Sequence, residues 1–150
     1  MKKEIRSPKT TDEWQEYYDL RYRVLRQPWN QPRGSERNEG DETGLHFALF
    51  ESGKITAIAR LDQSAQFEAQ VRFVAVESFV QGRGYGQLIM EACEKVAFER
   101  GDTKMILHAR EVALDFYKRL DYELVEKSHL LFGEIQHYLM EKELKFNSNL

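Results

Sequence analysis

Three glycines at alternate positions, Gly82, Gly84 and Gly86, lie between an apolar run and a segment with helical spacing. Glycine weakens strands and helices alike, so three of them here indicate that bare backbone is needed. A strand that passes through a glycine-rich turn into a helix makes a good anion site. The first-turn N–H groups have no intrahelical partner, and the aligned peptide dipoles add partial positive charge. The stretch therefore predicts a phosphate site, more specifically a diphosphate site, with Arg83 adding a full charge beside it.

Two common nucleotide motifs do not fit this stretch. The dinucleotide fingerprint G-x-G-x-x-G fails because Gln87 stands where its third glycine belongs. That fingerprint also falls early in a βαβ unit, whereas several antiparallel strands precede this one. The nucleotide P-loop fails because no Gly-Lys-Ser/Thr ending follows. The residues alone leave open a diphosphate of another kind, or a glycine-rich turn that binds no ligand.

Periodicity and turn residues predict one domain over residues 1–150 with a mixed α/β fold. The helix near the N-terminus is expected to be capped by Thr11 or Asp12. The expected order is strand (3–8), helix (11–25), two strands (45–62), strand (65–78), helix (85–100), strand (103–109), helix (110–120) and two strands (122–127 and 135–144). The expected inner faces are Leu88, Ala92, Cys93 and Val96 on the second helix, and Val112, Ala113, Phe116, Tyr117 and Leu120 on the third.

Charge and composition exclude several classes of function. A formal net charge of -3 argues against a nucleic-acid partner, which normally meets a basic excess or patch. The single cysteine, Cys93, rules out an internal disulfide and fits a reducing compartment. No apolar run approaches the roughly 18 residues that a membrane span needs, and no metal-ligand spacing is present. We therefore expect a cytoplasmic protein without a membrane, nucleic-acid or metal partner.

The glycine stretch and its surroundings, residues 71–125, resemble a known family. Residues 81–86, Gln-Gly-Arg-Gly-Tyr-Gly, match the Q/R-x-x-G-x-G/A acetyl-CoA signature of the GNAT N-acetyltransferase superfamily. The preceding 71–76 is similar to that family's fourth strand, and 106–125 is similar to its next strand, helix and strand. The resemblance implies the acyl-CoA N-acyltransferase fold, with antiparallel N-terminal strands and helical crossovers around a splayed central strand pair. It also implies acetyl-CoA as co-substrate.

The resemblance implies a set of coenzyme-binding residues. Backbone N–H groups of the glycine stretch would hold the CoA diphosphate, with Gln81 and Gln87 flanking it. The pantetheine arm would pair with the backbone of 74–76 like an added strand, which agrees with an apolar strand leading into the anion site. The implied set is Val74, Ala75, Val76, Gln81, Gly82, Arg83, Gly84, Tyr85, Gly86 and Gln87.

Acyl transfer from a thioester to an amine makes three demands: a neutral amine, a stabilised carbonyl oxygen and a protonated leaving thiolate. The Val76 N–H is the expected oxyanion donor. Tyr117 matches the family's tyrosine that points at the CoA sulfur, so the resemblance implies that it is the general acid. Phe116 and Tyr117 also fit a reading as two core aromatics of an amphipathic helix.

The sequence does not single out the general base. Glu77 follows the strand, and His46, His108 and His137 lie on expected strands. A histidine near pKa 6.5 can take an ammonium proton directly or through water, but each also fits a structural role. We take His137 as the first candidate, because some GNAT proteins with a long loop at 26–44 carry a histidine in the closing strand.

Two residues depart from the family pattern. Arg110 stands where many relatives carry an asparagine, and Asp121 replaces a glycine after the Phe-Tyr pair. Arg110 would reach the CoA phosphates or lie in solvent, and Asp121 indicates a different turn into the next strand.

The polar loop 26–44 is the part of the sequence that is expected to lie on the side of the amine acceptor. Its acids would attract a cationic amine, unless the loop is only a charged solvated surface; they are Glu36, Glu39, Asp41 and Glu42.

We therefore expect an acetyl-CoA-dependent N-acetyltransferase acting on a small-molecule or protein amine. The alternative is a module of the same fold that binds acyl-CoA as a sensor or interaction domain without turnover. Pairing through an edge strand or the closing hairpin would make a homodimer.

Overall fold

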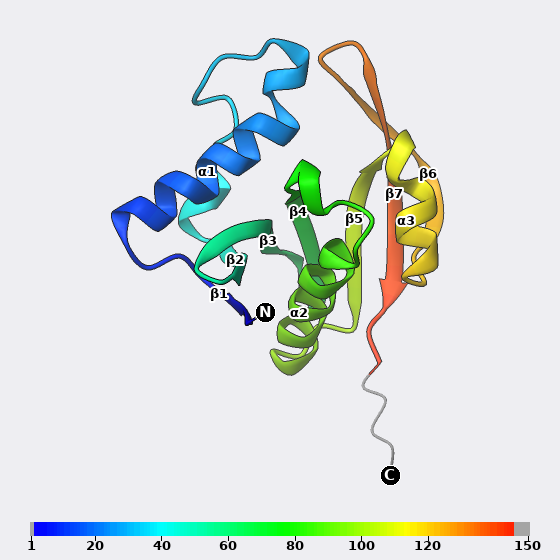
Figure 1. Cartoon of the computed structure of the whole chain (residues 1–150). Coiled ribbons are helices and arrows are strands. Elements are labelled where there is room, and N and C mark those ends of the chain that lie inside the picture. Colours follow the sequence, from blue (N-terminus) through cyan, green and yellow to red (C-terminus); the bar gives the residue numbers. More distant parts are fainter. Residues whose placement is uncertain (1, 146–150) are drawn as a thin grey trace. The chain divides into compact units, whose positions relative to one another are not determined.

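The computed structural model describes residues 2–145 and contains one mixed sheet with strand order β1-β2-β3-β4-β5-β7-β6 (Figure 1). The predicted α/β class and element order are confirmed. The strands are β1 (Lys3–Arg6), β2 (Leu45–Glu51), β3 (Lys54–Ala65), β4 (Glu68–Val76), β5 (Lys104–Arg110), β6 (Glu123–Leu131) and β7 (Ile135–Glu143). The helices are α1 (Thr11–Leu25), α2 (Tyr85–Glu99) and α3 (Leu114–Arg119). No helix in this described part of the chain has the length and apolar character to cross a bilayer.

The described residues form two compact units. The first unit contains the chain up to Asp62 together with Val71–Cys93, and the second contains Gln63–Gln70 and the chain from Glu94 onward.

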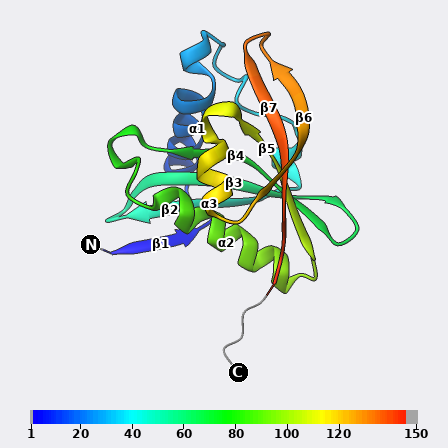
Figure 2. The same cartoon turned by 90° about the vertical axis from the view of Figure 1, so that its right-hand side faces the viewer.

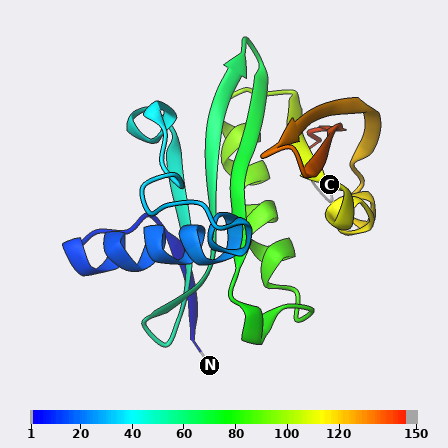
Figure 3. The same cartoon turned by 90° about the horizontal axis from the view of Figure 1, so that it is seen from above.

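In the first unit, α1 begins at Thr11 and its N-cap is Thr10, not the expected Thr11 or Asp12. The Thr10 hydroxyl accepts a hydrogen bond from the Glu13 N–H, and the Glu13 carboxylate accepts one from the Thr10 N–H, which makes a capping box. The inner face of α1 packs Tyr17 and Leu20 into a core with residues from β2 and β3, among them Ala48, Phe50, Ile55 and Ile58. Figure 3 shows α1 from above, lying across these strands.

The β2–β3 hairpin forms at the expected turn, Glu51 to Lys54. Ser52 and Gly53 both have positive φ, 52° and 84°, as a two-residue hairpin turn of the primed type requires. Glu51 pairs with Lys54, and β2 also pairs with β1 on its other side, so the sheet begins antiparallel as predicted.

Helix α2 follows the glycine stretch, and its buried face differs from the expected one. Ile89, Met90, Cys93 and Ala97 are fully buried, whereas Leu88 is 38% exposed. Ile89, Cys93 and Ala97 are spaced by four residues, and this row faces the core. The predicted stop at Gly101 is confirmed: its φ of 100° allows the Asp102 N–H to donate back to the Ala97 carbonyl.

The second unit is built on β5 and the β6–β7 hairpin (Figure 2). β5 pairs parallel with Glu68–Gln70 of β4 and antiparallel along its whole length with β7. The third helix is shorter than predicted, because Glu111–Ala113 forms a 3₁₀ turn and α3 starts at Leu114. The expected burial of Val112 is wrong, since its side chain is 87% exposed. Tyr117 and Tyr122 are buried in this unit.

Candidate functional site

The turn between β4 and α2 carries the glycine stretch. Gly82 and Gly84 have φ values of 80° and 85°, the left-handed region that side chains disfavour. A Cβ built on either glycine would meet no atom within 4 Å, so this backbone faces open space. Gly86 lies in the first turn of α2 and is buried. The two left-handed glycines therefore shape the turn, and they leave its backbone open to a ligand.

The N–H groups of this turn are unpaired. Within residues 2–145, none of the six successive N–H groups from Gly82 to Gln87 donates to a backbone or side-chain acceptor. The first N–H of this region with a partner is that of Leu88, which donates to the Gly84 carbonyl at 3.1 Å. Unpaired donors at a helix start, together with the positive end of the helix dipole, form an anion-binding nest. The donor set fits a diphosphate.

The side chains around this nest have different roles. Arg83 and Gln87 are exposed beside it. The Gln81 side chain donates to the Val76 carbonyl at 3.2 Å. The Tyr85 side chain is buried, and its hydroxyl donates to Glu51. Tyr85 therefore offers a ligand its backbone N–H but not its ring.

Strand β4 presents its last residues in a defined orientation. The Glu77 N–H donates to the Thr56 carbonyl on β3 at 2.8 Å. Because successive N–H groups of a strand point to opposite sides, the N–H groups of Val76 and Val74 point away from β3. Upstream, Phe73 has a φ of 56°, and a left-handed residue inside a strand interrupts the regular alternation as a β-bulge does. Val74 to Val76 therefore carry the edge that an added strand-like ligand needs.

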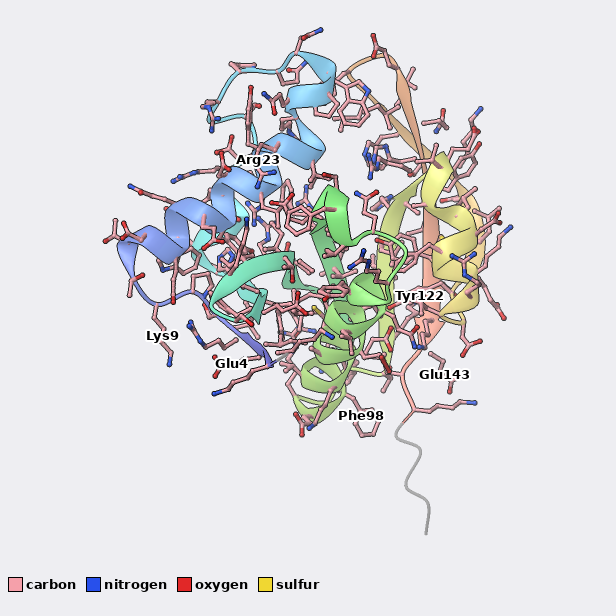
Figure 4. All side chains as sticks on the ribbon, in the orientation of Figure 1. Glu4, Lys9, Arg23, Phe98, Tyr122 and Glu143 are labelled. Carbon is pink, nitrogen blue, oxygen red and sulfur yellow. The ribbon has the colours of Figure 1, made fainter. Side chains whose placement is uncertain are left out.

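Glu77, one of the four candidate bases, is held in an ion pair. Arg23, labelled on α1 in Figure 4, donates to both Glu77 carboxylate oxygens at 2.7 and 3.0 Å. The bond from Arg23 outweighs burial and lowers the pKa of Glu77 below its usual range. A carboxylate that is hard to protonate is a weak base, so this geometry argues for a structural role.

His46 is engaged at both ring nitrogens. Its Nε2 lies 2.8 Å from the Asp41 carbonyl, which only accepts, so Nε2 carries the proton. Its Nδ1 lies 2.8 Å from the Tyr17 hydroxyl. Burial lowers the pKa of His46, which keeps the ring neutral. His46 is therefore a satisfied structural histidine.

The loop 26–44 is organised by two buried arginines that the sequence reading missed. Arg21 and Arg60 are both 0% exposed, and both donate to Asp41 at 2.8 to 3.0 Å. Arg60 also binds both oxygens of Asp62. The one signal in the sequence was position: Arg21 falls on the inner stripe of α1, and Arg60 interrupts an apolar strand. An arginine at an apolar position predicts a buried carboxylate partner.

In the second unit, Tyr117 is 8% exposed and packs edge-to-face against its neighbour Phe116, with ring centroids 4.9 Å apart. The ring centroid of Tyr122 lies 5.8 Å from that of Tyr117, also edge-to-face. Arg110 is partly buried, so it does not simply lie in solvent, and this burial lowers its pKa. Asp121 has a φ of 72° and so adopts the left-handed conformation that glycine favours. The replacement of glycine by Asp121 therefore does not require a different turn.

His137 lies on β7 opposite Arg110 on β5, in a group with His108 and His129. The His137 Nδ1 is 3.0 Å from the Ile135 carbonyl, so it carries the proton and leaves Nε2 as the basic nitrogen. Its ring stacks on His129 with centroids 4.3 Å apart. Burial, then the charges of His129, Arg110 and His108, lowers the pKa of His137. Unlike His46, which is engaged at both ring nitrogens, His137 therefore keeps one nitrogen that can act as a base.

The lowered pKa of His137 predicts a pH-dependent stability. Below pH about 6.5 the unfolded chain takes up a proton at this ring that the folded chain refuses. The His137 contribution is therefore complete above pH 6.5 and is lost as the pH falls from there toward the lowered value. We expect the slope of unfolding free energy between pH 7.5 and 5.5, measured by urea denaturation, to decrease in His137→Gln. An unchanged slope would show that His137 titrates normally.

The structure thus gathers the predicted residues into two groups. Val74 to Gln87 form one continuous segment of the first unit. Tyr117, Arg110 and His137 lie in the second unit, on α3, β5 and β7.

Comparison with known proteins gives a consistent result. The sequence matches the acetyltransferase (GNAT) family over residues 11–122. It is 25% identical over 135 residues to the uncharacterized N-acetyltransferase YjcF of Bacillus subtilis (strain 168), covering 90% of this chain and 96% of the relative. Among solved structures, the fold is similar to a putative N-acetyltransferase from Lactobacillus plantarum, with a TM-score of 0.82 at 20% identity over 96% of this chain and 98% of that one.

A second solved structure, an aminoglycoside 6'-N-acetyltransferase complexed with coenzyme A, has a TM-score of 0.81 at 15% identity, over 99% of this chain and 100% of that one. At these identities the structural likeness concerns the fold. The family match covers most of the sequence, including β4, the nest and α2. The chain therefore belongs to the acetyltransferase (GNAT) family and has its acyl-CoA N-acyltransferase fold.

Proposed function

We propose that this protein transfers the acetyl group of acetyl-CoA to a primary amine by direct attack of the amine on the thioester carbonyl. The observation that carries the proposal is the run of six N–H groups from Gly82 to Gln87, none of which has a partner among residues 2–145. Acetyl-CoA supplies the activated acyl group, and its diphosphate is the anion that this nest is suited to hold.

Three residues have proposed roles in the transfer. Val76 donates its N–H, which points away from β3, to the carbonyl oxygen as that oxygen gains charge. His137 accepts a proton from the amine at Nε2, directly or through water. Tyr117 gives its hydroxyl proton to the departing thiolate. The new C–N bond forms as the C–S bond breaks, so the products are an N-acetyl amide and CoA with a free thiol.

The test is to incubate the protein with acetyl-CoA and a panel of amines, and to follow the released thiol with a thiol reagent. Release that depends on the amine, with an acetylated product found by mass spectrometry, supports the proposal. If CoA raises the melting temperature but no amine gives release, the protein binds acyl-CoA without turning it over.

A matched glycine pair tests the nest itself. Gly84 and Gly53 have nearly the same φ, 85° and 84°, and open space around a built Cβ, but Gly53 lies in the β2–β3 turn. Alanine at either site is expected to cost a similar stability, about 1–2 kcal/mol, because the left-handed conformation disfavours Cβ. Only Gly84→Ala is expected to weaken CoA binding, by about tenfold, or roughly 1.4 kcal/mol. If calorimetry finds equal CoA affinity in both variants, the nest does not bind the CoA diphosphate.

A further inference from the structure

The ring of Phe73 is surrounded by arginines. Four guanidinium carbons lie within 6 Å of its centroid, at distances that cation–π contacts allow. They belong to Arg21 at 4.2 Å, Arg60 at 5.0 Å, Arg72 at 5.2 Å and Arg26 at 5.7 Å. Like charges at such spacing repel one another unless anions lie between them.

Two acidic side chains of the protein form ion pairs with the two buried arginines, Arg21 and Arg60. Asp41 binds Arg21 and Arg60, and Asp62 binds Arg60. The Arg72 side chain is exposed and makes no hydrogen bond or ion pair with any residue that the structure describes. The fully buried Arg21 keeps its Nε without a hydrogen-bond partner in the same described part of the chain.

Neighbouring cations disfavour the charged forms of Arg72 and Arg26, although Asp62 and Asp41 near Arg72 and Glu36 near Arg26 offset part of this effect. The pKa of Arg72 is lowered, first by loss of water around its guanidinium and then by the charge of Arg60. The pKa of Arg26 is lowered by burial and then by Arg21. A cation that is disfavoured by its neighbours gains when an anion binds beside it.

The left-handed conformation of Phe73 brings the Arg72 side chain close to the Val74–Val76 edge, where the proposed acetyl transfer takes place. In a regular strand Arg72 and Phe73 would point to opposite faces. Here the Arg72 guanidinium lies over the Phe73 ring, so the bulge brings both side chains to one side. Val74 follows two residues after Arg72, roughly 7 Å along the strand. An anion on Arg72 would therefore lie within a small molecule's length of the Val74–Val76 edge.

We propose that the acceptor amine carries an anionic group, a carboxylate or a phosphate, which Arg72 binds beside Phe73 with Arg26 and Arg21 behind it. The inference rests on the proposed acetyl transfer and names the acceptor class for it. Of the four loop acids, Asp41 is bonded to arginines and Glu36 to Arg37 and the Gly34 N–H, so only the exposed Glu39 and Glu42 remain to attract a cationic acceptor.

The experiment compares acceptors that differ in the anionic group. One arm pairs amino acids with their C-terminal amides, and the other pairs phosphoethanolamine with ethanolamine, all at saturating acetyl-CoA. We expect kcat/KM to favour the anionic member of one arm by about tenfold or more, and the favoured arm distinguishes carboxylate from phosphate. In Arg72→Gln this preference should fall toward unity through a higher KM. Because the same substrates are compared in both proteins, differences in intrinsic amine reactivity cancel.

Arg33→Gln is the matched control. Arg33 is an exposed arginine of the 26–44 loop that pairs with Asp19, so its loss should leave the preference intact. A preference for the uncharged amines, or a preference unchanged in Arg72→Gln, overturns the proposal while leaving acetyl transfer in place.

A binding readout separates this inference from the proposed function. With CoA present at saturation to fill the nest, inorganic sulfate should raise the melting temperature of the wild type and of Arg33→Gln more than that of Arg72→Gln. If no amine is acetylated but this difference is found, the anion site stands and the acetyl transfer fails. If all three proteins respond alike to sulfate, Arg72 binds no anion and the inference fails.

Discussion

Replacing Tyr117 by phenylalanine is expected to lower kcat by about 100-fold or more while leaving acetyl-CoA affinity within about twofold. A phenol has an ordinary pKa near 10, which matches a departing thiolate closely enough for late proton transfer. Phenylalanine keeps the edge-to-face contacts with Phe116 and Tyr122, so the packing is preserved and only the hydroxyl is lost. Steady-state kinetics and CoA titration measure the two quantities separately.

Tyr122→Phe is the control for this variant. Tyr122 is buried next to Tyr117, but its hydroxyl donates to Glu94 at 2.7 Å. Its loss should cost roughly 1–3 kcal/mol of stability, because the Glu94 carboxylate loses a partner, and should leave kcat almost unchanged. Full turnover in Tyr117→Phe would exclude Tyr117 as the general acid. Its role would then be that of a buried core aromatic.

Replacing Asp41 by alanine is expected to lower the free energy of unfolding by about 3–5 kcal/mol. Burial disfavours the Asp41 carboxylate, but Arg60 and Arg21 outweigh it and lower its pKa. The side chain also accepts from the Asn38 N–H at 3.1 Å, which closes a capping box in the 26–44 loop. Without Asp41, Arg21 has no carboxylate and Arg60 keeps only Asp62. Two arginines at 0% exposure would then hold one charge uncompensated.

Urea denaturation measures this loss, and Glu42→Ala is the neighbouring control. Glu42 is exposed next to Asp41 in the sequence, so its removal should change stability by no more than about 0.5 kcal/mol. A change below about 1 kcal/mol in Asp41→Ala would mean that water replaces the carboxylate at the arginines and that the network does not hold the loop.

Local chemistry explains what could be predicted from the sequence. The apolar runs of β2 and β3, the turn at Ser52-Gly53, the end of α2 at Gly101 and the glycine turn before α2 all depend on residues within a few positions of one another. The nest could be predicted in the same way, because the family motif that marks it spans only residues 81–86. Errors occurred where the buried face of a helix was judged by periodicity alone, as for Leu88 on α2, which is 38% exposed. Val112 matched an inner stripe, but the segment starts as a 3₁₀ turn and exposes it.

The sequence by itself determined the order of elements, the mixed sheet and the backbone nest, because these follow from φ preferences, periodicity and unpaired N–H groups near one another in the chain. Only the tertiary structure decided which charges meet. Arg21, Asp41, Arg60 and Phe73 are separated by long stretches of sequence and are brought together by the packing of α1 and the 26–44 loop against β3 and β4. The same packing placed the Glu77 carboxylate beside Arg23. Coulomb and hydrogen-bond energies depend on distances of a few ångströms, and folding sets those distances for residues that the sequence keeps far apart.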